Sequence, residues 1–343
     1  MHEPVSYVMP VLDEAEHVRN AVLSILAQQY EGDIEIVLAL GPSTDSTNRI
    51  VAELIASDPR IRSVPNPTGG TPAGLNAAIR ATTHPIVVRV DAHTVLPQNY
   101  TAIAVEAMQR TGAGNVGGVM DAVGRTPFER AVALAYTSRV GLGGGPHHIG
   151  GEEGPAETVY LGTFRRDALE DVGLFDERIR RGQDWELNRR LRAAGHAVWF
   201  TPAMRVVYRP RSGLNDLVRQ FAHTGRWRGE LVRRFPAANS VRYFIPPVMV
   251  VAVVLGTLLG VAGIITAAIT GTFEGAAGWL QLAWIIPAVY ILFVLGATVV
   301  VGTRAGVRGA LWFAVVLPFI HFAWGTGFIL GLLKLTRSAH PGR

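Results

Sequence analysis

The 343-residue chain contains no cysteine. Disulfide bonds and thiolate catalysis are therefore excluded, and the composition agrees with a reducing compartment such as the cytosol. No amino-terminal secretory signal is expected, because the first apolar segment, residues 5–12, is short and contains Pro10. The chain also lacks the usual nucleic-acid-binding motifs, so no nucleic-acid partner is expected. We therefore expect the amino-terminal part to remain cytoplasmic.

Charged residues are nearly absent from the carboxyl-terminal third. Between residues 243 and 333 the only formally charged residues are Glu274, Arg304 and Arg308. The uncharged runs at 243–273, 275–303 and 309–333 each exceed the roughly 20 residues that cross about 30 Å of hydrocarbon. This pattern predicts an α-helical transmembrane domain over residues 243–335, with about three spans in the plasma (inner) membrane.

The basic residues around these runs leave the topology open. Arg242 precedes the first run, the first loop has no Lys or Arg, and Arg304 and Arg308 lie in the second loop. A cytosolic start satisfies the positive-inside rule to this point. Three full spans, however, place Lys334 and the rest of the basic tail outside. Either the rule is weakly violated, or one segment is re-entrant. His321 is the one ionisable residue inside a run, with an acceptor-phosphate contact or helix packing as its possible roles.

In the amino-terminal part, segments with the apolar pattern of a strand alternate with segments that have the apolar spacing of a helix. Expected strands are residues 5–12, 34–40, 61–64, 86–90, 115–123 and 158–164, and expected helices are residues 16–29, 47–55, 75–81, 100–111 and 128–139. Strand–helix alternation with short connections is typical of an α/β domain with a mostly parallel, right-handed crossover sheet.

The strongest chemical signal follows the apolar run at residues 85–90. Asp91 and His93 come directly after this run, two residues apart, so both side chains can reach one ion at the carboxyl end of the sheet. A carboxylate with an imidazole suits a divalent cation (Mg²⁺ or Mn²⁺), which in turn suits a diphosphate. The alternative is an Asp that caps the next turn, beside a solvated His.

A second chemical centre lies at residues 182–191, where helical spacing places Asp184 and Glu186 at the start of a helix. Asp184 is either a first-turn residue that favours the helix dipole or a general base, and the two roles are compatible. Upstream, the loop at 141–154 contains seven glycines and the pair His147 and His148. This loop is interpreted as a mobile lid or acceptor-entry loop, with a metal-ligand role for the histidines as the alternative.

Residues 216–235 form a basic amphipathic helix just before the first apolar run. Together with the net charge of +5, this helix favours binding to anionic headgroups at the membrane interface. A buried core helix with a solvated basic face is the alternative. The expected organisation is a catalytic domain over residues 1–212, an interface helix region over 213–242 and the transmembrane domain over 243–335.

Four ordered motifs resemble family 2 glycosyltransferases. They are Pro-Val-Leu-Asp-Glu at 10–14, Ser-Thr-Asp-Ser-Thr at 43–47, the Gly-rich helix start at 69–76 and Asp-Ala-His at 91–93. Within that family, the sequence at 39–43, 90–93 and 159–166 is similar to that of membrane-attached glucosyltransferases of succinoglycan biosynthesis. The resemblance covers about residues 4–230 and continues into the apolar runs.

The resemblance implies a GT-A (Rossmann-like) fold, a nucleoside-diphosphate sugar donor and, for this subset, an inverting reaction. It implies a general-base role for Asp184 and a metal-ligand role for Asp91 and His93. Nucleotide-sugar binding is assigned by the resemblance to Pro10, Val11, Glu14, Ser43, Asp45, Gly74, Asn76 and Asp91. Acceptor binding is assigned to Gly162, Thr163, Gln183, Trp185, Arg226 and Trp227.

Two departures from the family pattern concern specificity. Leu40 and Gly41 replace a common Asp pair that contacts the base, and His93 replaces the second Asp of the metal motif. The expected activity is transfer of one sugar to a lipid-linked, polyprenyl-diphosphate-bound acceptor. Rival interpretations are a polyprenyl-phosphate sugar synthase, a non-catalytic nucleotide-sugar sensor or scaffold, and a transporter; the transporter is disfavoured because no internal repeat occurs.

Overall fold

The computed structural model describes residues 2–179, 181–236 and 239–335. The chain divides into two compact units. Among the described residues, the first contains residues up to 121 and residues 144–208, and the second contains residues 122–143 and those from 209 to 335.

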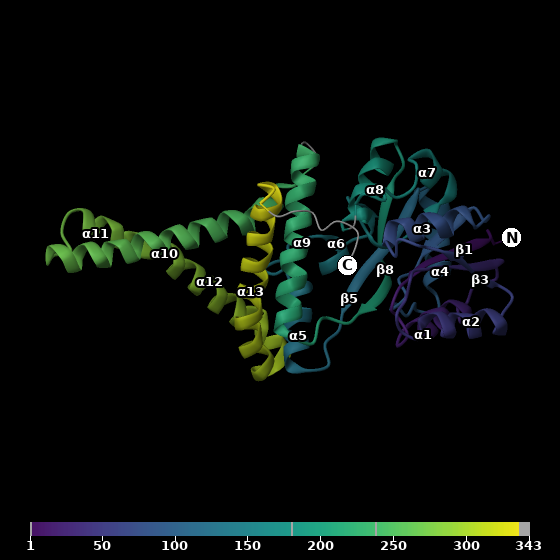
Figure 1. Ribbon diagram of the computed structural model, residues 1–343, viewed down its shortest axis with the longest axis horizontal. Coiled ribbons are helices and arrows are strands. Elements are labelled where there is room, and N and C mark those ends of the chain that lie inside the picture. The colour runs from purple at the N-terminus through teal and green to yellow at the C-terminus, as the bar shows by residue number, and fades with distance from the viewer. Residues whose placement is uncertain (1, 180, 237–238, 336–343) are drawn as a thin grey trace. The chain divides into compact units, whose positions relative to one another are not determined.

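The first unit is built on an eight-stranded sheet of order β3-β2-β1-β4-β7-β5-β8-β6 (Figure 1). The strands are β1 (Val5–Val11), β2 (Ile34–Leu40), β3 (Ile61–Pro65), β4 (Ile86–Arg89), β5 (Asn115–Ala122), β6 (Gly154–Pro155), β7 (Tyr160–Arg165) and β8 (Val198–Tyr208). Pairs β1–β2, β2–β3 and β1–β4 are parallel, whereas β4–β7, β5–β7 and β6–β8 are antiparallel. The change of direction occurs next to β4, the strand that leads into Asp91.

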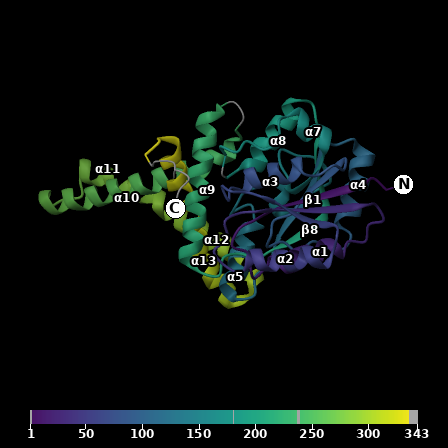
Figure 2. The same cartoon turned by 45° about the vertical axis from the view of Figure 1, so that its right-hand side comes forward.

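Helices cover both faces of this sheet. Its helices are α1 (Val18–Leu26), α2 (Thr47–Ser57), α3 (Thr71–Arg80), α4 (Tyr100–Thr111), α6 (Pro146–Ile149), α7 (Arg166–Asp171) and α8 (Gln183–Ala193). Side chains of α1, α2 and α4 share one apolar core with Tyr7 and Met9 of β1, and side chains of α3, α7 and α8 share a second core with Val8. Alternating residues of β1 thus enter opposite cores, as the period of two requires. Figure 2 shows α1 and α2 on one side of the sheet and α3, α7 and α8 on the other.

The second unit is helical. It contains α5 (Pro127–Tyr136), α9 (Leu214–Arg234), α10 (Ile245–Thr270), α11 (Ala276–Gln281), α12 (Ile285–Val300) and α13 (Gly306–Leu332). Three helical segments, Val241–Thr270, Ala276–Val300 and Gly302–Leu332, are long and apolar enough to cross a membrane.

The expected fold class, a mostly parallel GT-A-like α/β domain followed by long apolar helices, is confirmed. The partition of the chain differs from the expected one, because residues 122–143 pack with the carboxyl-terminal helices. The reason is local. In α5, Phe128 contacts the ring of Trp312 and Tyr136 contacts the ring of Phe221, at centroid distances of 5.3 and 5.5 Å.

Candidate active site

A buried arginine at the end of β4 organises the site. Arg89 follows three buried apolar residues of the strand and is itself only 5% exposed. Its Nε and Nη2 atoms donate to Asp91 Oδ1 at 3.1 and 3.0 Å, and its Nη1 donates to Asp184 Oδ1. One guanidinium therefore joins the two carboxylates that the sequence singled out, although they lie far apart in the chain.

Burial and the neighbouring charges shift the pKa values of Asp184 and Arg89. The pKa of Asp184 is raised, because burial disfavours its charged form; Arg89 opposes this change and the negative charge of Asp91 adds to it. Burial alone lowers the pKa of Arg89, but Asp184 and Asp91 outweigh it, and the net effect is a raised pKa. Arg89 is thus a fixed cation. The Asp184 side chain keeps 40% of its surface exposed, so a substrate can reach it.

Among the described residues, neither the turn after β4 nor the start of α8 is capped by a carboxylate side chain. The turn after β4 is closed by the backbone, since Thr94 N donates to the carbonyl of Asp91 at 2.8 Å while the carboxylate binds Arg89. The residue that caps α8 is Gly182, at φ 75°, and within the described residues no side chain caps this helix end. Asp184 lies in the first turn of α8, where the helix dipole favours a carboxylate.

His93 lies beside the β1–α1 loop. Its Nδ1 is 2.9 Å from Glu14 Oε1, so the two predicted donor-site residues are brought together. Among the residues that the structure describes, no group of three His, Asp or Glu side chains could hold a metal ion. Mg²⁺ and Mn²⁺ are commonly held by one or two protein ligands plus substrate phosphates. The pair Asp91 and His93 fits an ion bound in this way, rather than one held by protein alone.

Ser43 and Asp45 hold two loops together. Ser43 Oγ accepts from Asp13 N at 3.1 Å, and the Asp45 carboxylate accepts from Ala15 N at 3.1 Å and Thr47 N at 2.9 Å. These hydrogen bonds, mainly those from Thr47, lower the pKa of Asp45. Both predicted donor-binding residues therefore position the β1–α1 loop that carries Glu14.

The predicted nucleoside cradle is only partly assembled. A Cβ at Gly74 would lie 3.0 Å from Pro10 Cβ, so these two positions lie side by side as expected. Val11, next to Pro10, is buried. Asn76 points elsewhere, because its amide binds the backbone of Phe175 through both its nitrogen (2.9 Å) and its oxygen (3.0 Å). Asn76 thus holds the segment that follows α7.

A leucine occupies the region of the missing Asp pair. A Cβ at Gly41 would lie 3.0 Å from Leu12 Cδ1, and one at Gly69 would lie 3.0 Å from Leu12 Cδ2. Leu12 therefore covers both glycines, and a carboxylate at position 41 would require it to move.

Three predicted acceptor residues are internal to the fold. A Cβ at Gly162 would lie 2.4 Å from the Phe164 ring and 2.5 Å from Asn115 Oδ1, so this glycine makes room for protein side chains rather than for a sugar. Thr163 is fully buried and Trp185 is 4% exposed. These three predicted acceptor residues are therefore buried within the first unit. Gln183, the first residue of α8, is half-buried.

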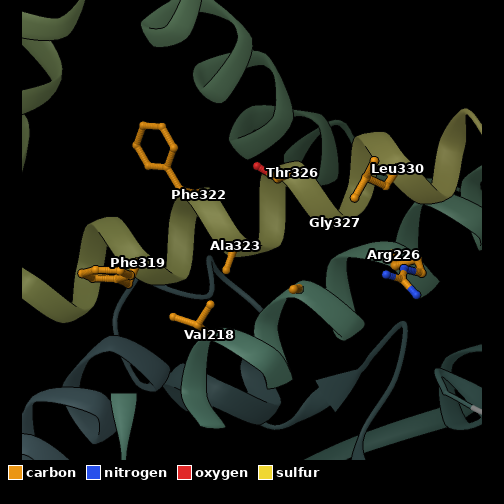
Figure 3. Close-up of a pocket in the computed structure, with 9 residues that line it drawn as sticks. Val218, Arg226, Phe319, Phe322, Ala323, Thr326, Gly327 and Leu330 are labelled. Atoms are coloured by element: carbon orange, nitrogen blue, oxygen red, sulfur yellow. The ribbon is translucent and has the colours of Figure 1, made fainter. Parts of the chain in front are cut away.

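Arg226 borders a cavity in the second unit. The cavity, about 350 Å³, lies between α9 and α13 and is lined by Val218, Ala222, Arg226, Phe319, Phe322, Ala323, Thr326, Gly327 and Leu330 (Figure 3). Arg226 Nε is buried and has no hydrogen-bond partner among the described residues. Trp227, half-buried, is not part of this lining.

The histidine pair lies in α6, a single turn at residues 146–149 inside the Gly-rich loop. The rings of His147 and His148 are 4.2 Å apart, and the described residues supply no third ligand for a metal. A metal role for this pair therefore has no structural support.

Known proteins place this geometry in a family. The family described as Glycosyl transferase family 2 matches residues 6–173. The succinoglycan biosynthesis protein ExoA of Rhizobium meliloti (strain 1021) is 30% identical over 332 residues, covering 96% of this chain and 95% of that protein. The chain belongs to glycosyltransferase family 2. The predicted resemblance to the succinoglycan-biosynthesis type is confirmed.

Two further comparisons are more distant. The glycosyltransferase AglE of Haloferax volcanii is 25% identical over 198 residues, covering 57% of this chain and 64% of that protein. The mannosyltransferase PcManGT of Pyrobaculum calidifontis, solved in complex with GDP-Man and Mn²⁺, aligns over 99% of this chain and 89% of that chain with a TM-score of 0.58. At 19% identity, this likeness is one of fold.

Arg89 is the functional residue that sequence reasoning missed. An arginine inside an apolar strand is a signal, because a charged side chain at a buried strand position needs a partner. Its neighbour Asp91 was visible in the sequence, but Asp184 could not be paired with it without the fold.

Proposed function

We propose that this glycosyltransferase moves one sugar from a nucleoside-diphosphate sugar to a hydroxyl group of a lipid-linked saccharide. The acceptor class is polyprenyl-diphosphate-linked glycan, used in exopolysaccharide or cell-envelope glycan synthesis. The supporting observation is the contact of Arg89 with both Asp91 and Asp184, which places a solvent-accessible carboxylate beside the predicted diphosphate region. The name of the Rhizobium relative supports the polysaccharide assignment.

In the proposed reaction, Asp184 is the general base. A sugar hydroxyl has a pKa far above neutrality, so a positioned carboxylate must accept its proton as the oxygen attacks the anomeric carbon. Burial raises the pKa of Asp184, which makes it a stronger base than an exposed carboxylate. Arg89 opposes this rise in pKa and holds the carboxylate through a hydrogen bond. The nucleoside diphosphate leaves from the opposite face, and the anomeric configuration inverts.

The donor side is assigned to the ends of β1 and β4. Pro10, Val11 and Gly74 would border the nucleoside, with Glu14 beside His93. Asp91 and His93 would hold Mg²⁺ or Mn²⁺, which neutralises the charge that develops on a leaving diphosphate. Ser43, Asp45 and Asn76 act by holding the surrounding loops.

The acceptor lipid is assigned to the second unit. The cavity between α9 and α13 is apolar along most of its lining, with Arg226 at its border and one buried nitrogen of that side chain unpartnered among the described residues. This chemistry suits an isoprenoid chain with an anionic phosphate. Gln183, at the start of α8, and Trp227 are the remaining acceptor candidates. The catalytic unit is placed on the cytoplasmic side of the inner membrane.

The second candidate function is a polyprenyl-phosphate sugar synthase, in which the lipid phosphate is the acceptor. The Arg226 cavity is compatible with this function. An ionised phosphate needs no base, however, so the contact of Asp184 with the buried Arg89 favours a hydroxyl acceptor. A non-catalytic sensor would bind donor without turnover.

The test uses the full chain in detergent with radiolabelled nucleotide sugars and total membrane lipid. We expect a labelled lipid-linked saccharide from the native protein, and a loss of about 10²–10⁴ in transfer for Asp184→Asn, the typical contribution of a general base. Donor binding should persist. The matched control is Asp171→Asn, since that carboxylate is 58% exposed and pairs with His196 at the far end of α7.

Three outcomes would contradict the proposal in different ways. A labelled lipid monophosphate formed equally by Asp184→Asn indicates the synthase. Donor binding without any product across the sugar panel indicates the sensor. Normal transfer to a saccharide by Asp184→Asn places the base elsewhere.

A further inference from the structure

The three long apolar helices differ in what they touch. Helices α10 and α12 pack against each other and against the short α11 segment, through small residues such as Gly256 and Gly260, which contact residues 283–287. Helix α13 contacts α10 and α12 as well, but it also lies against α5 and most extensively against α9, which both carry charged residues. Figure 1 shows α13 (yellow) alongside α9 (green).

The contact between α9 and α13 is made by backbone atoms. A Cβ at Gly225 would lie 2.0 Å from the Trp324 carbonyl oxygen, and one at Gly229 would lie 2.1 Å from the Phe328 oxygen. From the other side, a Cβ at Gly331 would lie 2.0 Å from the Arg226 oxygen. Along this contact, the residue numbers of α9 and of α13 increase in the same direction. The two helices therefore run parallel, at the closest approach that glycines permit.

The middle of α13 touches irregular backbone. His321 Nε2 donates to the carbonyl oxygen of Val140 at 2.8 Å, and its Nδ1 lies 3.1 Å from Tyr290 Oη in α12. Since a carbonyl only accepts, the proton is on Nε2, and Nδ1 accepts from the tyrosine. Val140 follows the exposed Arg139 in the non-helical segment after α5. The first half of α13 contacts α5 through Trp312 and Phe128.

These neighbours do not suit a span. If α13 crossed the bilayer, His321 would lie near its centre and would bring the 137–143 loop with it, yet lipid-exposed irregular backbone is not found in hydrocarbon. Because α9 packs parallel to α13, α9 would then also lie in the hydrocarbon of the bilayer. That helix carries Arg219, Arg226, Arg228, Arg233 and Arg234, and arginine near the bilayer centre is strongly unfavourable.

We propose that α13 lies along the membrane surface beside α9, and that only α10 and α12 cross the bilayer. The exposed apolar residues of α13 agree, because Val307, Leu311, Val315 and Phe319 recur every four residues and form one stripe that can enter the interface. The partner is thus the interfacial layer of the bilayer, on the side from which residue 242 enters.

The distribution of basic residues supports the same topology. With two spans, Arg242, Arg304, Arg308 and Lys334 all fall on one side, and the loop that joins α10 to α11 on the other side has no Lys or Arg. The positive-inside rule is then satisfied throughout, including the tail that three spans would place outside. The sequence left open a weak violation of the rule or a re-entrant segment; a third helix on the membrane surface satisfies the rule without either.

The absence of cysteine provides the test, since each introduced cysteine is the only thiol in the chain. Single variants Glu274→Cys, Leu335→Cys and Arg139→Cys of the full chain are labelled with a membrane-impermeant maleimide in intact bacterial cells and in inverted membrane vesicles. We expect Glu274→Cys to react in intact cells. Leu335→Cys and the control Arg139→Cys should react only in inverted vesicles. Reaction of Leu335→Cys in intact cells would establish three spans and overturn the proposal.

A second measurement reports the depth of α13 in the bilayer directly, rather than the side of the membrane on which residue 335 lies. Spin labels at positions 307, 311, 315 and 319 are compared for collision with oxygen and with a water-soluble nickel chelate. A surface helix gives a similar shallow depth at all four positions. A steady increase in depth from 307 to 319 would contradict the proposal. Neither measurement uses transfer activity, so failure of the glycosyltransferase assignment would leave this test unaffected.

Discussion

Arg89 links two carboxylates whose roles differ. It donates two hydrogen bonds to Asp91, in the donor region, and one to Asp184, the proposed base. Burial raises the pKa of Asp184, and the guanidinium of Arg89 opposes this rise. Arg89 is therefore a positioning residue that acts through Asp184.

This role predicts a change in pH dependence. Arg89 lowers the pKa of Asp184, so Arg89→Met should raise that pKa, and the acidic limb of kcat/KM should move to higher pH. For each pH unit that the limb moves, the ionised fraction of Asp184 at a given acidic pH falls about tenfold. The measurement is kcat/KM against pH for native protein, Arg89→Met and Arg89→Lys. The lysine variant keeps the charge and should move the limb less; an unmoved limb in Arg89→Met would leave Arg89 with a purely structural role.

The proposed ion predicts a second set of results. Chelation of divalent cations should abolish transfer by the native protein, because the leaving diphosphate is then uncompensated. His93→Ala should require roughly tenfold or more Mn²⁺ for half-maximal activity, in line with the usual sensitivity of metal sites. His196→Ala is the control, since that ring pairs with Asp171. Full activity of His93→Ala in the presence of chelator would remove the metal from the mechanism.

The sequence identified residues better than it identified their surroundings. Asp91, His93, Glu14 and Asp184 were found because each lies at a strand or helix end. Strand periodicity does not say which face of β7 other elements cover, so the full burial of Thr163 could not be predicted. Arg89 was passed over because its second partner is supplied by α8, a contact that only the fold makes.

At the level of elements, the pair α9 and α13 depends on glycine. The step from Gly327 to Gly331 was visible in an apolar run, but its partner step from Gly225 to Gly229 lies in an arginine-rich helix that is not an obvious membrane-helix partner. Both steps place backbone against backbone. The strands and helices that were expected lie close to observed ones, but β8 was not expected. The antiparallel pairing of β7 was not predicted either, because pairing direction is set by non-local contacts.

This packing predicts that a Gly→Ala substitution in the contact lowers stability, although helix propensity alone predicts that it raises stability. Alanine is about 0.8–1 kcal/mol more favourable than glycine inside a helix, so Gly→Ala should be neutral or stabilising where space exists. Gly225→Ala would place a methyl group against the Trp324 carbonyl and should lower the unfolding temperature in detergent, since overpacking costs about 1–3 kcal/mol. The control is Gly296→Ala in α12, where a Cβ meets nothing within 4 Å among the described residues. Equal thermal shifts for the two variants would contradict the close contact.

For the chain as a whole, the boundary between units does not follow the sequence. Residues 1–212 were expected to form one catalytic domain, yet α5 within that range belongs to the helical unit. The composition of α5 does not indicate that it belongs to the helical unit, because its sequence has the pattern of an ordinary amphipathic helix. Its apolar face is matched by side chains nearly a hundred residues or more away in sequence, as with Tyr136 and Phe221 or Phe128 and Trp312.

This arrangement predicts how a truncated chain behaves. A protein that ends at residue 212 loses Phe221 and Trp312, so Tyr136 and Phe128, at present 4% and 8% exposed, become exposed to water. Each buried aromatic side chain contributes about 1.5–3 kcal/mol by leaving water, and an uncovered pair favours association. We therefore expect the truncated protein to aggregate in detergent-free buffer.

The same two positions should have opposite effects in the two contexts. Phe128→Gln with Tyr136→Gln should make the truncated protein more soluble, because the exposed face becomes polar. In the full chain the same pair should lower the unfolding temperature, because the partners Trp312 and Phe221 remain and the glutamines are buried against them. Size-exclusion chromatography of the truncated proteins and thermal unfolding of the full chains measure the two effects. A native truncated protein that runs as a monomer without detergent would mean that α5 does not depend on the carboxyl-terminal helices for its cover.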